Sequence, residues 1–139
     1  MMRIAKLTLT AVAAASIATP AALAQGWPDK PIKMIVPFAA GGGTDFVARL
    51  AAKHLTARLG QSVYVENRGG ANGIVGLQAL KQSPPDGYTI EVASDGPLVI
   101  NHGLYKEKLP YDSTKDWTPV HMLNKFVGLI VINPKVPAK

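Results

Sequence analysis

The stretch IKMIVPFAAGGGTD, residues 32–45, decides the fold class of this chain. It opens with branched apolar residues bounded by Pro31 and Pro37, a pattern typical of a buried β-strand. Three consecutive glycines then make a flexible turn, and Thr44 or Asp45 is placed to cap a following helix. The stretch therefore predicts a strand, a glycine-rich loop and a helix start in direct succession.

The same alternation continues toward the carboxyl end. Apolar residues at four-residue spacing predict a helix over 46–59, and Gly60 is a natural stop. The later elements are expected as a strand over 62–66, a glycine-rich loop over 67–73, a helix over 74–82 and a strand over 88–94. This order predicts an α/β fold with a parallel sheet and right-handed crossovers.

The pattern weakens beyond Pro97. We expect a short helix over 101–108 and another apolar strand over 126–132, which Asn133-Pro134 ends. The last residues of the chain are typical of a linker inside a longer protein.

Residues 1–24 have the three parts of a secretory signal peptide. Arg3 and Lys6 precede an apolar run over 7–18, and Ala22-Leu23-Ala24 is a small-residue cleavage site. The apolar run is shorter than the ~20 residues that span a bilayer. We therefore expect export to the periplasm, with a mature chain that starts near Gln25.

Composition argues against several classes of function. The chain has no cysteine and three histidines far apart in sequence, and no zinc-protease or nucleophile-elbow signature occurs. Lys and Arg are scattered, although the net charge is +6, whereas nucleic-acid binding needs a clustered basic face. We expect a non-catalytic protein without a cofactor, metal or nucleic-acid partner.

Ligands of parallel α/β sheets bind beyond the carboxyl ends of the strands. Three loops are expected there, over 38–45, 67–73 and 94–97. The first two lead into helices, whose unpaired N–H groups and positive dipole ends bind anions. Two such loops suit the two ends of a small dianion, or one carboxylate and a polar tail. The alternative is that the glycines only make tight turns and that Asp45 is a plain cap.

A nucleotide site fits the first loop poorly. A P-loop needs a lysine before Thr44, and none is present. A dinucleotide fingerprint needs a third glycine where this chain has Phe46.

Several short motifs occur in a specific order along the chain. They are WPDKPI (27–32), VPFAAGGGTD (36–45), VENRGGANG (65–73), PDGYT (85–89), LPYD (109–112) and DWTP (116–119). Together they resemble the Bug family, the extracytoplasmic solute receptors of tripartite tricarboxylate transporters. The resemblance implies lobe 1 of a two-lobed, type II periplasmic binding protein. Such a receptor captures small organic acids or related solutes and presents them to membrane permease subunits.

The resemblance also implies ligand contacts from three loops. These are Phe38, Ala39, Gly42, Thr44 and Asp45 in the first, Ala71, Asn72 and Gly73 in the second, and Ser94 and Asp95 in the third. Asp95 departs from the small Ser/Thr/Gly run that the family more often shows there.

Members of the family are more than twice this long. The resemblance therefore implies that residues 25–125 form an incomplete N-terminal ligand-binding lobe. Residues 126–139 would then form a strand and the start of a crossover to a second lobe. Three interpretations stay open: a transport receptor whose fragment is weak or inactive alone, an exported ligand sensor for a signalling partner, and a truncated, non-functional product.

Overall fold

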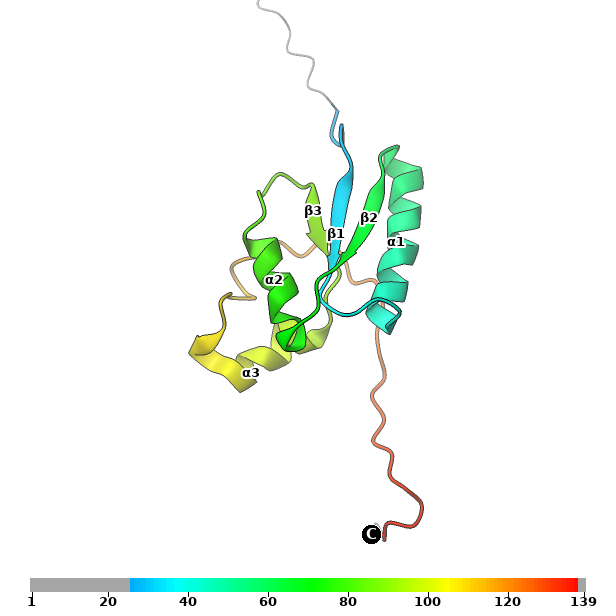
Figure 1. Ribbon diagram of the computed structural model, residues 1–139, viewed down its shortest axis with the longest axis vertical. Helices are drawn as coiled ribbons and strands as arrows, with labels where there is room; N and C mark the ends of the chain where they lie inside the picture. Colours follow the sequence, from blue (N-terminus) through cyan, green and yellow to red (C-terminus); the bar gives the residue numbers. More distant parts are fainter. Residues whose placement is uncertain (1–25, 138–139) are drawn as a thin grey trace, which may run out of the picture.

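A computed structural model describes residues 26–137; the expected signal peptide, residues 1–24, lies outside them. The main elements are β1 (Ile32–Val36), α1 (Gly43–Leu59), β2 (Val63–Asn67), α2 (Ile74–Lys81), β3 (Thr89–Glu91) and α3 (Asn101–Tyr105). The three strands form a parallel sheet in the order β2-β1-β3. α1 and α2 lie on either side of it (Figure 1). The predicted α/β alternation is confirmed.

β1 is the central strand and is buried on both faces. Ile32, Met34 and Val36 pack against Ala48 and Ala52 of α1. On the opposite face lie Ile35 and, from α2, Leu77, both fully buried. Burial on both faces explains why β1 is a nearly continuous apolar run rather than an alternating one.

α1 starts earlier than its sequence indicated. Its N-cap is Gly42, without a side-chain cap bond, so the prediction of Thr44 or Asp45 as the cap is wrong. Asp45 instead lies in the first turn, and its carboxylate accepts a hydrogen bond from the Gly41 N–H at 2.9 Å. This bond reaches backward along the chain, which a cap pattern read from residue types alone does not reveal.

Two of the family-like motifs, at 27–32 and 85–89, meet at the amino ends of the strands. The Asp29 N–H donates to the Tyr88 hydroxyl at 3.0 Å, and the Lys30 ammonium lies 3.4 Å from the Asp86 carboxylate. The Trp27 ring lies over Gly87 and beside Tyr88. These motifs therefore stabilise the end of the sheet opposite the glycine-rich loops.

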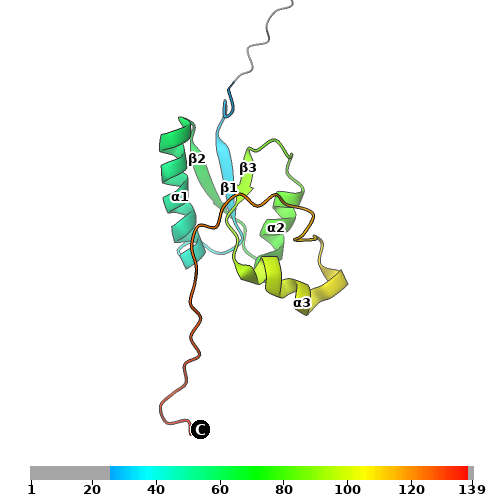
Figure 2. The ribbon, with the colours of Figure 1, turned by 180° about the vertical axis from the view of Figure 1, so that it is seen from behind.

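The end of the described chain differs from expectation. Residues 118–133 have neither helix nor strand, so the predicted strand over 126–132 is wrong. Val127 is 87% exposed and Ile130 is 100% exposed. The segment crosses the back of the sheet and then runs away from it (Figure 2). An apolar run becomes a strand only beside a hydrogen-bonding neighbour, and no described strand lies next to this one.

Two other elements are shorter than predicted. β3 covers three residues instead of the seven expected over 88–94, and α3 ends at Tyr105, followed by a single 3-10 turn over Lys106–Lys108.

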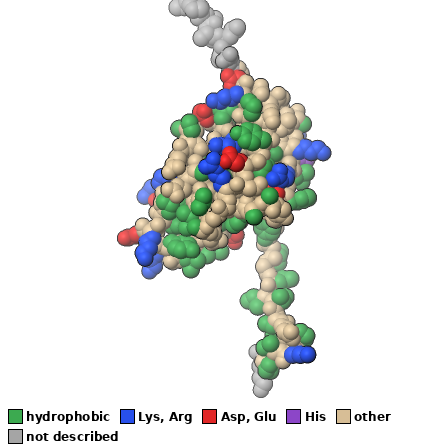
Figure 3. All heavy atoms as spheres, viewed as in Figure 1, with side chains coloured by type: hydrophobic (Ala, Val, Ile, Leu, Met, Phe, Trp, Pro, Cys, Tyr) green, Lys and Arg blue, Asp and Glu red, His purple; other side chains and the backbone are tan. Residues whose placement is uncertain are grey.

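None of the helices in residues 26–137 combines the length and hydrophobicity needed to cross a bilayer. Lys and Arg side chains are dispersed over the face shown in Figure 3.

Candidate ligand-binding site

The three predicted loops meet at the carboxyl ends of the strands. The second loop is bonded to the end of β1 by the Arg68 N–H, which donates to the Val36 carbonyl at 2.8 Å. It is bonded to the first loop by the Asn67 amide, which donates to the Phe38 carbonyl at 3.1 Å. The second and third touch where Gly73 faces Pro97: a Cβ on Gly73 would lie 2.9 Å from the Pro97 ring. The site residues predicted from sequence therefore share one end of the sheet.

Asp45 anchors the first loop. One carboxylate oxygen accepts hydrogen bonds from the Gly41 N–H and from Arg49 Nε, both at 2.9 Å, and the other accepts from the Asn67 amide at 2.9 Å. The Arg49, Gly41 and Asn67 bonds hold the pKa of Asp45 well below its ordinary range. Both oxygens are engaged internally, so the side chain shapes the loop and has little capacity left for a ligand.

The first turn of α1 carries backbone N–H donors that have no acceptor among residues 26–137. Phe46 is the first residue whose N–H bonds back along the helix, to the Gly42 carbonyl at 3.0 Å. The N–H groups of Gly43, Thr44 and Asp45 consequently have no helical acceptor. Because α1 is 17 residues long, its dipole adds a partial positive charge at this end. The arrangement suits an anion without a side-chain cation.

The second loop is a run of four residues with positive φ. The angles are 137° at Gly70, 47° at Ala71, 52° at Asn72 and 86° at Gly73. Glycine adopts these angles freely, whereas Ala71 and Asn72 are held in a conformation that non-glycine residues seldom take. The Gly73 N–H closes the turn on the Gly70 carbonyl at 3.0 Å, directly before α2.

Tyr111 forms a hydrogen bond to the third loop. Its buried hydroxyl donates to the Pro97 carbonyl at 2.6 Å. A Cβ added at Gly96, in the same loop, would lie within 4 Å of the Asn72 carboxamide.

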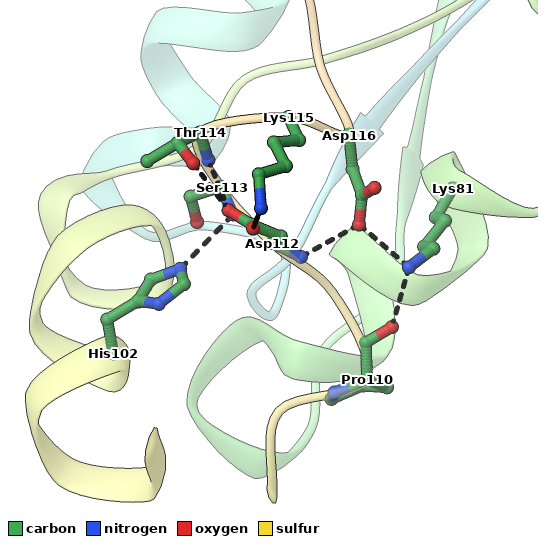
Figure 4. A network of polar contacts seen from close by, with 8 residues as sticks. All are labelled: Lys81, His102, Pro110, Asp112, Ser113, Thr114, Lys115 and Asp116. Atoms are coloured by element: carbon green, nitrogen blue, oxygen red, sulfur yellow. Dashed lines mark hydrogen bonds and ion pairs between the residues drawn. The ribbon is translucent and has the colours of Figure 1, made fainter. Parts of the chain in front are cut away.

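A polar network formed by Pro110 and residues 112–116, on both sides of Tyr111 in the chain, ties this segment to the neighbouring helices (Figure 4). Asp116 accepts from the Asp112 N–H and pairs with Lys81 of α2, both at 2.7 Å. His102 Nε2 of α3 accepts from the Ser113 N–H at 3.1 Å. The segment after α3 is thereby fastened to both α2 and α3.

The burial of the predicted site residues varies. Ala39, Gly42, Ala71, Asn72 and Asp95 are exposed, Phe38, Thr44 and Ser94 are half-buried, and Asp45 and Gly73 are buried. Sequence reasoning missed Asn67, Asn101 and Tyr111, which tie the loops together. Of these, only Asn67 carried a sequence signal, its place at the start of a glycine-rich loop. Within residues 26–137 no group of three or more His, Asp or Glu side chains is placed to hold a metal ion.

The family model of the tripartite tricarboxylate transporter family receptor matches residues 47–139. The chain belongs to this receptor family. The family consists of solute receptors rather than enzymes, and its match covers most of the described fold, including the second and third loops.

Two similar proteins and one solved structure support the assignment to this family. A UPF0065 protein of Bordetella bronchiseptica is 43% identical over 84% of this chain, and the BugT protein of Bordetella pertussis is 42% identical over 90% of it. The chain spans 35% and 38% of the length of these two relatives. The MatC protein of Rhodopseudomonas palustris, solved with bound malate, is 38% identical, with a TM-score of 0.66 over 69% of this chain and 32% of its own.

Replacing Asp45 with asparagine is expected to loosen the first loop. The variant keeps the size of the side chain but removes the charge that strengthens the bonds from Gly41 and Arg49. The Gly41 amide should exchange with solvent roughly tenfold faster or more, while the Met34 amide of β1 keeps its protection. Amide hydrogen exchange checks this, with Asp86→Asn at the opposite end of the sheet as the control.

The wild-type loop should also respond to acid. Because the folded pKa of Asp45 lies below 3.8, protection of Gly41 is present at neutral pH and is lost only well below pH 3.8. Equal exchange at Gly41 in wild type and Asp45→Asn would contradict the anchoring role.

Proposed function

We propose that this chain supplies one wall of a binding site for small carboxylates in an exported solute receptor. The observation that carries the proposal is the set of free N–H groups at the start of α1, which opens where three loops meet. The malate held by MatC is a small dicarboxylate of the expected kind. Residues 1–24 have the pattern of a secretory signal, and membrane permease subunits of a tripartite tricarboxylate transporter are the proposed partners.

The proposal is tested by substituting Gly43, the first residue of α1. Proline is well accepted at a first helical position, where its missing N–H has no helical role. The preceding Gly42 is extended, with φ −80° and ψ 170°, as a residue before proline prefers. Gly43→Pro therefore removes one proposed ligand donor and preserves the helix. Gly43→Ala retains the donor and is the matched control, because a Cβ there meets nothing closer than 4.0 Å.

Malate, succinate, citrate and acetate should be titrated into the 139-residue chain while backbone amide chemical shifts are recorded. Saturable shifts are expected at residues 43–45 and 70–73 with the dicarboxylates. Gly43→Pro should weaken that binding about tenfold, the worth of one hydrogen bond to a charged group, and Gly43→Ala should leave it unchanged. The proposal fails if no carboxylate shifts these amides, or if the two variants bind equally.

A further inference from the structure

Asn101 is a completely buried polar residue at the start of α3, with 0% of its surface exposed. Its Oδ1 accepts a hydrogen bond from Asn72 Nδ2 at 2.7 Å, and its Nδ2 donates to the Asn72 carbonyl at 3.2 Å. It therefore contacts both the side chain and the backbone of one residue in the second loop.

The backbone bond determines how both carboxamides are oriented. The Asn72 carbonyl only accepts hydrogen bonds, so Asn101 must turn its nitrogen toward it. The Asn101 oxygen then faces the Asn72 side chain, which must in turn present its own nitrogen. The Asn72 oxygen is left without a hydrogen-bond partner among the described residues.

This pair also explains how Asn72 keeps its unusual backbone. A non-glycine residue at φ 52° persists where surrounding contacts impose that conformation. Asn101 supplies those contacts from α3, which begins directly after the helical turn that contains Pro97 of the third loop. The two loops are thus linked through one buried side chain.

We propose that Asn101 is a positioning residue of the candidate carboxylate site, which holds the left-handed second loop and fixes the orientation of the Asn72 carboxamide. This inference rests on the proposed function for the role of the loop, and on the contacts above for its geometry. Asn101 itself does not touch the ligand.

Asn101→Asp tests the proposal within a single variant, because protonation of the introduced carboxyl group at low pH should restore both hydrogen bonds to Asn72. At low pH the introduced carboxyl group is protonated, so its O–H donates to the Asn72 carbonyl and its other oxygen accepts from Asn72 Nδ2. At high pH its carboxylate repels the Asn72 carbonyl, and the loop should open. The protection factor of the Gly73 amide should match wild type near pH 4 and fall by about tenfold or more at pH 8. Malate affinity should fall in parallel.

Two further variants provide controls. Asn101→Leu removes both bonds and should show reduced Gly73 protection at every pH. Asn124→Asp adds the same charge on an exposed segment and should behave as wild type. The neighbouring titratable groups, Glu91, His102 and Tyr111, are common to all of these proteins, so the difference from wild type at each pH isolates the introduced group.

The outcomes separate this inference from the proposed function. If wild type binds no carboxylate, the proposed function fails, and the Gly73 protection factors still decide whether Asn101 positions the loop. If Asn101→Asp shows no pH-dependent difference from wild type at Gly73, the positioning role is overturned. It is also overturned if protection at Met34 of β1 falls together with that at Gly73, because Asn101 would then support the whole fold.

Discussion

Gly76→Ala is expected to destabilise the fold severely, by about 2–3 kcal/mol, out of the 5–15 kcal/mol that usually holds a domain together. Gly76 lies on the buried face of α2, where the helix crosses the end of β1. An added Cβ would lie 2.6 Å from Pro37 Cβ, 2.8 Å from Pro37 Cα and 3.2 Å from the Arg68 carbonyl oxygen. Backbone atoms cannot yield as a flexible side chain does, so α2 has to move away from the sheet.

The consequence extends to the candidate site. Pro37 directly precedes the first loop and Arg68 lies in the second, so a displaced α2 disturbs both. Thermal unfolding followed by circular dichroism should show a midpoint lowered by roughly 10 °C or more.

Gly103→Ala is the matched control. Gly103 lies inside α3, and nothing lies within 4 Å of its added Cβ. The usual advantage of alanine over glycine in a helix then applies, and stability should stay unchanged or rise by up to about 1 kcal/mol. If both substitutions had the same small effect, the close contact between α2 and Pro37 would be disproved.

The second large effect concerns Glu91 of β3. Its register partner is Ile35, so it projects to the α2 face of the sheet, and both carboxyl oxygens are buried without a hydrogen-bond partner among the described residues. Burial raises its pKa to about 8. In the unfolded chain the group loses its proton near pH 4.5, whereas the folded protein keeps the proton until about pH 8.

This difference makes stability fall as the pH rises. Between about pH 4.5 and 8 the free energy of unfolding should decrease by up to about 5 kcal/mol, and it should level off above pH 8. Asp45, Asp112 and Asp116 have lowered pKa values, so their contributions are lost at acid pH. Stability should therefore be greatest slightly above pH 4.

Glu91→Gln tests the assignment because glutamine resembles the protonated acid at every pH. The variant should match wild type near pH 4.5 and exceed it increasingly up to pH 8, as measured by urea unfolding across that range. Glu107→Gln, on an exposed turn, controls for the lost charge. Parallel pH profiles for wild type and Glu91→Gln would show that Glu91 ionises freely in the folded state.

Much of the architecture could be predicted because it rests on local patterns. Prolines and branched residues delimit β1, four-residue spacing marks α1, and glycine-rich segments mark the loops that meet at one end of the sheet. The apolar stripe of α1 was predicted less well. Its most buried apolar residues are Ala48 and Ala52. The spacing of larger side chains did not single them out, although such small residues allow the helix to approach β1 closely.

The sequence alone determined the order of the elements, the parallel sheet and the end of the sheet where the site lies, because each follows from short-range spacing and the chirality of crossovers. Only the tertiary structure decided that Asp45 anchors a loop and that Asn101 holds Asn72. It also decided that Glu91 is buried without a hydrogen-bond partner in the described part of the chain and that residues 126–132 do not form a strand. These features depend on contacts between residues distant in the chain: 22 positions separate Asp45 from Asn67, and 29 separate Asn72 from Asn101. Residue type shows what a side chain is able to bond, whereas the fold decides which partner comes within reach.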